Sequence, residues 1–318
     1  APHITAPHTV PLPPKVYAVI QARLNQLSPG ARQVANMAAV IGRAFSFELL
    51  SLATQRDEQD LIERLDELWQ RRIVREQGAN YDLGHDRIRD VTYAELSPIQ
   101  RKVLHRRVAE ALLQRHEANL DAVSAQLAYH YEAAGLVEQA VSCYLQAGTM
   151  AQQIYANHRA HALASRGLTL AQQLPASAER ARQELDLRLV SISALRVLQG
   201  WASTELYELL NQTLGLSNRV TDPTIHFRLK KGLFGYHVVR GNLNQAAGLA
   251  EELLLIAERE QVPLFLVVGY NNAAGVALPP QKALPPINTM PARSAARRGS
   301  ARSARAIFVS GPSGTRVI

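Results

Sequence analysis

The chain has few of the residues that identify an enzyme or a secreted protein. Cys143 is its one cysteine in 318 residues, which excludes an internal disulfide and a cysteine-based metal site. Neither His-Glu-x-x-His nor Gly-x-Ser-x-Gly occurs, so two common hydrolase patterns are missing. We therefore expect no catalytic residues and no metal site. Only a triad assembled from distant residues stays open, because such triads have no fixed spacing.

Long apolar runs are also missing. No stretch approaches the roughly 20 apolar residues that a membrane-spanning helix needs, and residues 1–14 lack the charged-then-apolar order of a signal peptide. We expect a cytoplasmic protein without a membrane partner. Residues 1–14 read APHITAPHTVPLPP, a proline-rich linker that does not begin with Met. This opening predicts that the chain starts partway through a longer protein.

Positive charge is in excess, but it is unevenly placed. The formal net charge is +8. Residues 278–318 contain seven basic residues and no acid, which leaves 28 basic against 27 acidic residues in the rest of the chain. The remainder is thus almost neutral, and the overall basicity is not evidence that it binds nucleic acid.

Helical periodicity dominates residues 15–277, and we expect a mainly α protein. Residues 15–116 predict a winged-helix-like module, in which short helices precede two extended runs at residues 73–76 and 81–83. Gln77-Gly78-Ala79-Asn80 separates these runs, as in a β-hairpin. The helix DRIRDVTYAEL and one long helix to His116 follow. In the helix before the hairpin, Leu65 and Trp69 are expected to face the core.

Residues 117–277 have the pattern of paired helices with small residues at their crossings. Ala134, Gly135 and Ala140 mark one turn between helices, and Gly241-Asn242 marks another. These spacings predict a tetratricopeptide-like (TPR-like) α-solenoid, whose repeats must stack to bury their apolar faces. Residues 278–318 are rich in Pro, Arg, Ser and Gly. We interpret them as a disordered or frame-shifted tail and favour a frame shift.

Three stretches carry a family resemblance. They are IQARLNQLSPGARQVANMAAVIGRAFSFELL, YDLGHDRIRDVTYAELSPIQRKVLHRRVAEAL and LAYHYEAAGLVEQAVSCYLQAG. Over residues 10–277 the chain resembles the region that follows the nucleotide-binding domain in bacterial STAND-type AAA ATPases, which include maltose-activator-like regulators. The resemblance implies a winged-helix arm that leads into TPR-like sensor repeats.

The resemblance also implies a nucleotide switch in the full-length protein. No Gly-x-x-x-x-Gly-Lys-Ser/Thr loop occurs in this chain, so no cofactor is expected in the segment itself, and ATP or ADP is implied for an upstream nucleotide-binding domain in cis. Gly84-His85-Asp86 matches the family's Met-His-Asp-like motif, with Leu83 in front in place of Met. The resemblance gives His85 and Asp86 a nucleotide-sensing role. Alternatively, both residues simply begin a helix.

Two functions remain open. In the first, the repeats bind a protein or a small-molecule inducer and thereby regulate the parent ATPase. In the alternative, the module is a DNA-binding transcription regulator that uses six basic residues near the wing: Arg87, Arg89, Arg101, Lys102, Arg106 and Arg107. Acidic residues interleave with these, which favours a solvated surface over DNA contact.

Four histidines were considered as metal ligands or packed residues. His158 and His161 are three apart and share a helix face, but no neighbouring Asp, Glu or Cys completes a metal site. They and His130 are expected in the core or at the surface. His105 lies in an Arg-rich helix, where we expect a surface or domain-contact residue.

Overall fold

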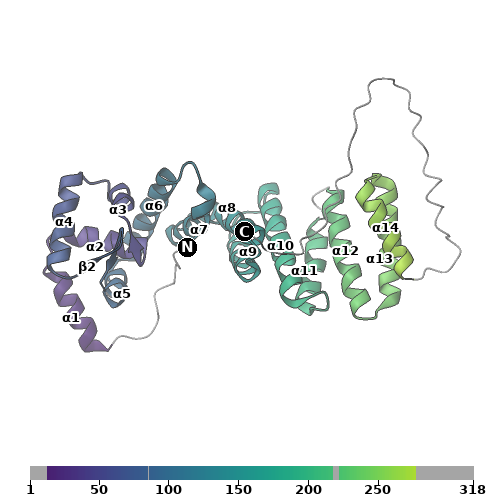
Figure 1. Cartoon of the computed structure of the whole chain (residues 1–318), viewed down its shortest axis with the longest axis horizontal. Coiled ribbons are helices and arrows are strands. Elements are labelled where there is room, and N and C mark those ends of the chain that lie inside the picture. The colour runs from purple at the N-terminus through teal and green to yellow at the C-terminus, as the bar shows by residue number, and fades with distance from the viewer. Residues whose placement is uncertain (1–12, 85, 218–221, 277–318) are drawn as a thin grey trace, which may run out of the picture. The chain divides into compact units, whose positions relative to one another are not determined.

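The computed structural model describes residues 13–84, 86–217 and 222–276 (Figure 1). Fourteen α-helices, one 3-10 helix and three short strands follow one another in these residues. The predicted mainly α fold, with a small hairpin module ahead of a helical solenoid, is confirmed. In the described part of the chain no helix is long and apolar enough to cross a membrane. The domain boundaries after residues 14, 116 and 277 stay predictions.

The winged-helix-like module contains six helices and a three-stranded antiparallel sheet of order β1-β3-β2. The hairpin pairs Val74 with Leu83 and Gln77 with Asn80, so its strands lie close to the predicted extended runs. Strand β1 is only two residues long, and no sequence pattern indicates it. The elements are α1 (Pro14–Asn25), α2 (Pro29–Ile41), β1 (Ala44–Phe45), α3 (Phe47–Thr54), α4 (Glu58–Gln70), β2 (Val74–Gln77), β3 (Asn80–Leu83), α5 (Asp86–Ala94) and α6 (Pro98–Arg115).

Side-chain caps fix where the module's helices begin. The Ser28 hydroxyl accepts a hydrogen bond from the Ala31 amide at 3.2 Å, and Pro29 occupies the first turn of α2. Asp57 accepts from the Gln59 amide at 2.9 Å and begins α4. Ser97 and Gln100 form a capping box at the start of α6. Each of these caps pairs amide groups that the start of a helix would otherwise leave without a partner.

Helix α4 corrects one expectation about the core. Leu61, Leu65 and Leu68 are buried, and their three- and four-residue spacing places them on one face of the helix. Trp69 comes one residue after Leu68 and so lies about 100° further round the helix. Its side chain is 51% exposed, so the prediction that Trp69 faces the core is wrong.

The repeat region consists of consecutive helices that pack against one another along the chain. Gly135 and Gly241 occupy two of the turns between helices with φ of 79° and 74°, a left-handed conformation that other residues adopt only with strain. The elements are η1 (Leu120–Val123), α7 (Ser124–Ala134), α8 (Val137–Gln153), α9 (Asn157–Ala171), α10 (Ala178–Gln199), α11 (Thr204–Ser217), α12 (Pro223–Val239), α13 (Leu243–Glu260) and α14 (Pro263–Gly275).

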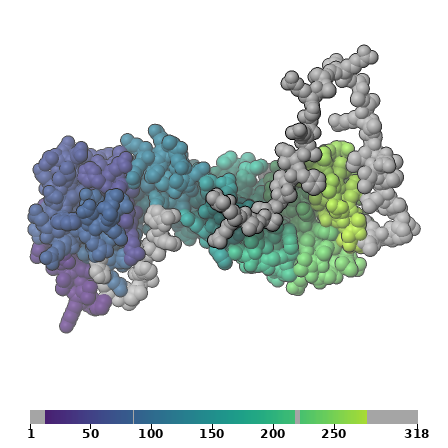
Figure 2. Space-filling model, in the orientation of Figure 1, coloured from purple at the N-terminus to yellow at the C-terminus, as the bar shows by residue number. Residues whose placement is uncertain are grey.

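The hydrophobic core runs without a break from the module into the first repeats. One cluster of buried side chains extends from Ile20 in α1 to Ala194 in α10. Helix α6 packs directly on α7, in the blue-to-teal part of the chain in Figure 2. Two smaller clusters lie among α10 to α14. The module and the helices α7 to α10 are therefore expected to unfold together.

Gly167 tests how tightly the repeats are packed. A Cβ atom added there would lie 2.9 Å from Leu187 Cδ2 and 3.1 Å from Tyr144 Cβ. We expect Gly167→Ala to lower the free energy of unfolding by about 1–3 kcal/mol, because overpacking forces neighbours to move. At the exposed Gly248 no atom lies within 4 Å of the added Cβ, so Gly248→Ala should raise stability by about 0.5–1 kcal/mol. Urea unfolding of both variants checks the opposite signs.

Candidate functional site

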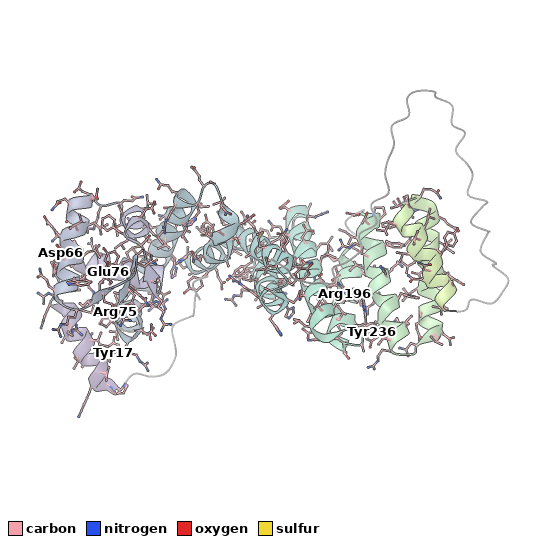
Figure 3. All side chains as sticks on the ribbon, in the orientation of Figure 1. Tyr17, Asp66, Arg75, Glu76, Arg196 and Tyr236 are labelled. Carbon is pink, nitrogen blue, oxygen red and sulfur yellow. The ribbon has the colours of Figure 1, made fainter. Side chains whose placement is uncertain are left out.

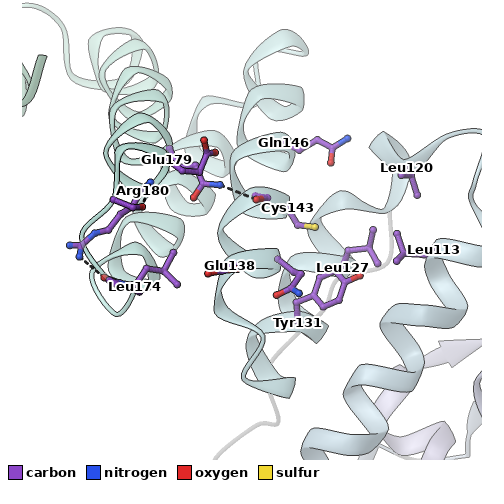
Figure 4. A pocket seen from close by; sticks show the side chains of 15 residues that line it. Leu113, Leu120, Leu127, Tyr131, Glu138, Cys143, Gln146, Leu174, Glu179 and Arg180 are labelled. Carbon is purple, nitrogen blue, oxygen red and sulfur yellow. Dashed lines mark hydrogen bonds between the residues drawn. The ribbon is translucent and has the colours of Figure 1, made fainter. Parts of the chain in front are cut away.

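A cleft of about 590 Å³ opens where the module meets the repeats (Figure 4). Its walls come from α6, η1, α7 and α8 on one side and from the start of α10 on the other. No sequence motif marks it, because its residues are drawn from five separate segments. They are Leu113, Leu120, Leu127, Tyr131, Glu138, Gln139, Ser142, Cys143, Gln146, Leu174, Pro175, Ser177, Glu179, Arg180 and Gln183.

The cleft has an apolar floor and a polar rim. Leu127 and Tyr131 are buried beneath it, and Glu138 and Glu179 are exposed at its edge. Gln183 Nε2 donates to the Ser142 hydroxyl at 3.1 Å, which joins α10 to α8 across the opening. Arg180 is held at the rim by a hydrogen bond to the Leu174 carbonyl. An apolar body with a few convergent polar groups is the usual composition of a ligand site.

Alkylation of Cys143 can measure how well the cleft wall encloses its thiol. Its thiol is half-buried in the cleft wall, and burial raises its pKa to about 11 from 9.0. This higher pKa lowers the fraction of Cys143 present as thiolate at pH 8 roughly hundredfold. We expect iodoacetamide to alkylate the native chain about that much more slowly than the urea-unfolded chain. Equal rates would mean that the thiol is not enclosed, and mass spectrometry reads this directly since the chain has one cysteine.

A buried pair of imidazoles lies at the same boundary. His105 Nδ1 on α6 is 2.8 Å from His130 Nδ1 on α7, and the Tyr93 hydroxyl on α5 is 3.0 Å from His105 Nε2. Both histidine side chains are buried. Of the two positions expected for His105, the surface is therefore wrong, whereas its contact with His130 of α7 fits a domain-contact residue. The basic residues of α6 made a buried histidine hard to predict, since Arg101 and Arg106 flank His105. His130 lies in the core, which is one of the two positions expected for it.

The contact between the two imidazoles requires the accepting ring to be neutral. One Nδ1 must donate and the other must accept, so a single proton lies between them. Burial lowers the pKa of His105 to about 4, with Arg89 and Arg101 adding to the effect. The pKa of His130 is lowered well below its usual value by burial and by His105. Protonating the accepting ring would turn its Nδ1 into a second donor and break this contact between α6 and α7.

The predicted nucleotide-sensing residues are only partly described. His85 lies outside the described residues. Asp86 is the first residue of α5, and its Oδ1 accepts from Arg43 Nε at 3.0 Å. A second bond from Arg43 to the same carboxylate makes the pair bidentate. Arg43 follows α2, so this ion pair connects the end of α2 to the start of α5. The sensing role of both residues stays a prediction.

Three of the six basic residues near the wing form contacts inside the module. Arg89 Nε donates to the Ala39 carbonyl at 3.2 Å. Arg101 donates to the Ala94 carbonyl at 2.9 Å and lies over the Tyr93 ring. Arg106 pairs with Glu110 at 3.7 Å. These contacts reduce the number of cations that remain for DNA phosphates.

Helix α4 also argues against DNA contact by the module. It precedes the wing, and its sequence EQDLIERLDELWQ has five acidic residues and one basic residue. Asp66 is exposed on this helix, and Glu76 is exposed on the wing beside Arg75 (Figure 3). An acidic helix repels the phosphate backbone, which supplies most of the affinity in DNA binding.

Of the two histidines three residues apart, His158 is exposed and His161 takes part in side-chain contacts. His161 Nδ1 is 2.8 Å from the Ser191 hydroxyl, and its Nε2 is 3.7 Å from Glu205. No group of three potential ligands from His, Cys, Asp and Glu comes together in the described ranges.

Comparison with known proteins gives partial similarities. No family model matches the sequence. An uncharacterised protein of Rhizobium meliloti (strain 1021) is 31% identical over 206 residues, which are 63% of this chain and 18% of that protein. The chain therefore spans less than a fifth of that relative.

Two solved structures are similar in part. One is a signal transduction ATPase with numerous domains (STAND) from Pyrococcus horikoshii, which has a tetratricopeptide repeat sensor. It has a TM-score of 0.37 and 11% identity, and the match covers 82% of this chain and 49% of that one. The other is BtubC from P. vanneervenii, with a TM-score of 0.27, 12% identity, and coverage of 89% and 100%. Neither similarity is close enough to assign a function.

Proposed function

We propose that the chain is a non-catalytic sensor segment of a larger regulatory protein. A protein or small-molecule inducer binds in the cleft between α6 and α10, and the winged-helix-like module responds. One observation carries this proposal: Leu113, from the last helix of the module, lines the same cleft as repeat residues from η1 to α10. A ligand there contacts both parts of the chain at once.

The continuous core supports an effect of ligand binding in the cleft on the winged-helix-like module. A ligand shifts an equilibrium only by its different affinity for two states. The cleft changes shape whenever α6 moves against α7 and α8, because its floor includes Leu127 and Tyr131 of α7. Binding thus favours one arrangement of α6, and α6 packs on α2 and α3 of the module. This is the linkage that an allosteric sensor needs.

A cleft-filling variant tests ligand binding. Thermal-shift measurements against a library of metabolites and short peptides should find compounds that stabilise the chain by mass action. Ser142 is exposed at the cleft wall, so Ser142→Trp should block those shifts. Thr149→Trp on the same helix is the matched control, since Thr149 is exposed outside the cleft. Compounds that shift both variants equally, and leave Cys143 alkylation unchanged, would refute a ligand site here.

The segment further acts on a nucleotide-binding domain in cis, through His85 and Asp86. The ion pair of Asp86 with Arg43 supports this, because it fixes the start of α5. A helix N-terminus favours negative charge, and an imidazole there can donate a hydrogen bond to phosphate.

Nucleotide binding tests this part of the proposal separately. We expect His85→Ala to weaken ADP binding in the protein extended upstream through its nucleotide-binding domain, while the 318-residue chain alone binds neither ADP nor ATP. Removing one hydrogen bond to a charged group corresponds to a loss of about tenfold. Isothermal titration calorimetry measures both. Unchanged ADP retention in the variant, or tight binding by the chain alone, would contradict the assignment.

A further inference from the structure

An aromatic cluster lies at one end of helices α10 to α12, away from the cleft. Tyr207 on α11 stacks on Tyr236 of α12 with ring centroids 4.4 Å apart. Trp201, in the turn between α10 and α11, covers Gly235, where an added Cβ would lie 3.1 Å from the indole ring. His237 meets Tyr207 edge-on at 5.7 Å. Two helices and the turn that precedes α11 thus supply one aromatic platform, which we call the α12 platform.

Two arginines lie on the faces of these rings. The Arg196 guanidinium is 5.4 Å from the centroid of Trp201, and that of Arg240 is 5.8 Å from the centroid of Tyr236. Figure 3 labels Arg196 and Tyr236 in the repeats. Neither arginine forms a salt bridge within the described residues. The nearby Glu205 accepts from Gln199 at 2.7 Å instead. Both guanidinium groups are therefore oriented but not neutralised.

One helix of the platform is basic. Helix α12 contains Arg228, Lys230 and Lys231 and no acidic residue, and Lys230 pairs with Glu252 of α13. Helix α11 carries the exposed Glu205 and Glu208 on either side of Tyr207. Arg228 and Lys231 are exposed and share a face with Gly235 and Val239, at spacings of three and four residues. Large aliphatic side chains are exposed around the same helix ends, at 40–58%: Val197, Val238, Val239 and Leu243.

We propose that the α12 platform is a docking surface for an acidic protein segment that carries apolar side chains. Ring-stacked guanidinium groups keep their N–H edges free, and a carboxylate can accept two hydrogen bonds from such an edge. The exposed aliphatic side chains provide the apolar contact area that a protein partner buries. Aromatic residues and arginines are also the types that dominate the binding energy of protein interfaces.

A protein partner fits this surface better than a nucleic acid does. Nucleic-acid sites follow the backbone with rows of cations, whereas the exposed valines and Leu243 would meet charged phosphates there. Acidic segments with interspersed Leu or Phe satisfy both the arginines and the aliphatic side chains. The proposal concerns a different surface from the cleft, and it stands whether or not the cleft binds an inducer.

Fluorescence anisotropy with the full chain tests the surface. The probe is a labelled synthetic peptide in which Asp and Glu alternate with Leu and Phe. We expect binding that weakens with salt, and a loss of roughly tenfold or more in affinity in the Arg196→Glu/Arg240→Glu double variant. Arg159→Glu, at an exposed position on α9, is the matched control and should bind normally. A peptide with Asn and Gln in place of the acids should not bind.

Either of two results would overturn the proposal. If the double variant binds the acidic peptide as well as the wild type does, the peptide binds elsewhere, for instance on the basic residues 278–318. If a DNA duplex binds the platform more tightly than the peptide at the same salt concentration, and the double variant abolishes that binding, the surface is a nucleic-acid site. Because both arginines are exposed, circular dichroism is expected to show the native helix content in every variant.

Discussion

Lowering the pH from 7 to 4 is expected to reduce the free energy of unfolding by about 3 kcal/mol through His105 alone. The pKa of His105 is about 4 in the folded chain against 6.5 for a free histidine, so the unfolded chain takes up a proton first as the pH falls. Because the pKa of His105 is lower in the folded chain than in the unfolded chain, its neutral form contributes stability above pH 6.5. That stability is lost as the pH falls toward 4. His130 shifts in the same direction and adds to the loss.

Urea unfolding at a series of pH values measures this loss. The reference is the His105→Leu/His130→Leu double variant, which removes both imidazoles and so leaves no buried ring unpaired. We expect its stability to change less than that of the wild type between pH 6.5 and 4. In His158→Gln, at an exposed histidine on α9, the free energy of unfolding should change with pH as it does in the wild type. If the double variant also shows the wild-type dependence on pH, the buried pair does not govern the acid sensitivity.

Leu187→Ala is expected to lower the free energy of unfolding by about 2–5 kcal/mol. Leu187 on α10 is fully buried in the core cluster that also contains the module. Its two methyl groups fill the space next to Gly167 on α9, and truncation leaves a cavity between the two helices. Urea unfolding followed by circular dichroism measures the loss, and a change below about 1 kcal/mol would show that the site collapses freely.

Combining Leu187→Ala with Gly167→Ala separates packing from other effects. The Cβ added at residue 167 fits into the space vacated by the leucine methyl groups. The double variant should therefore lose less stability than the two single losses added together, by roughly 0.5–3 kcal/mol. Strict additivity would mean that the two residues do not share one packing site.

Local sequence patterns predicted the secondary structure of the module well. Ser28-Pro29 and Asp57 are residue types that favour a helix start, and they begin α2 and α4. The Gly78 turn lies between two extended runs, and Gly78 adopts φ of 63°, so the hairpin could be predicted. Gly135 and Gly241 likewise marked helix turns. Each of these features depends on residues that are close in sequence.

Features formed by distant residues were not predicted. The cleft combines side chains from Leu113 to Gln183, and His105 meets His130 across 25 positions, so neither has a fixed spacing to recognise. Trp69 was misplaced because it lies four positions after Leu65, a spacing that favours one helix face, whereas the buried residues of α4 are Leu61, Leu65 and Leu68. The residues predicted to sense nucleotide, His85 and Asp86, rest on the family resemblance.

Hydrogen exchange in the Leu187→Ala variant is the most direct test of the central claim, that the repeats and the module are coupled through one core. Leu187 lies in α10, which packs mainly on α8, α9 and α11, so a local effect would be confined to these helices. If the module and the repeats share one core, slow amides in α2 and α5 also exchange faster in the variant, by a factor that matches the measured loss of stability. Unchanged exchange in α2 and α5, with faster exchange in α9 and α10, would show that the module folds independently and would contradict the sensor mechanism.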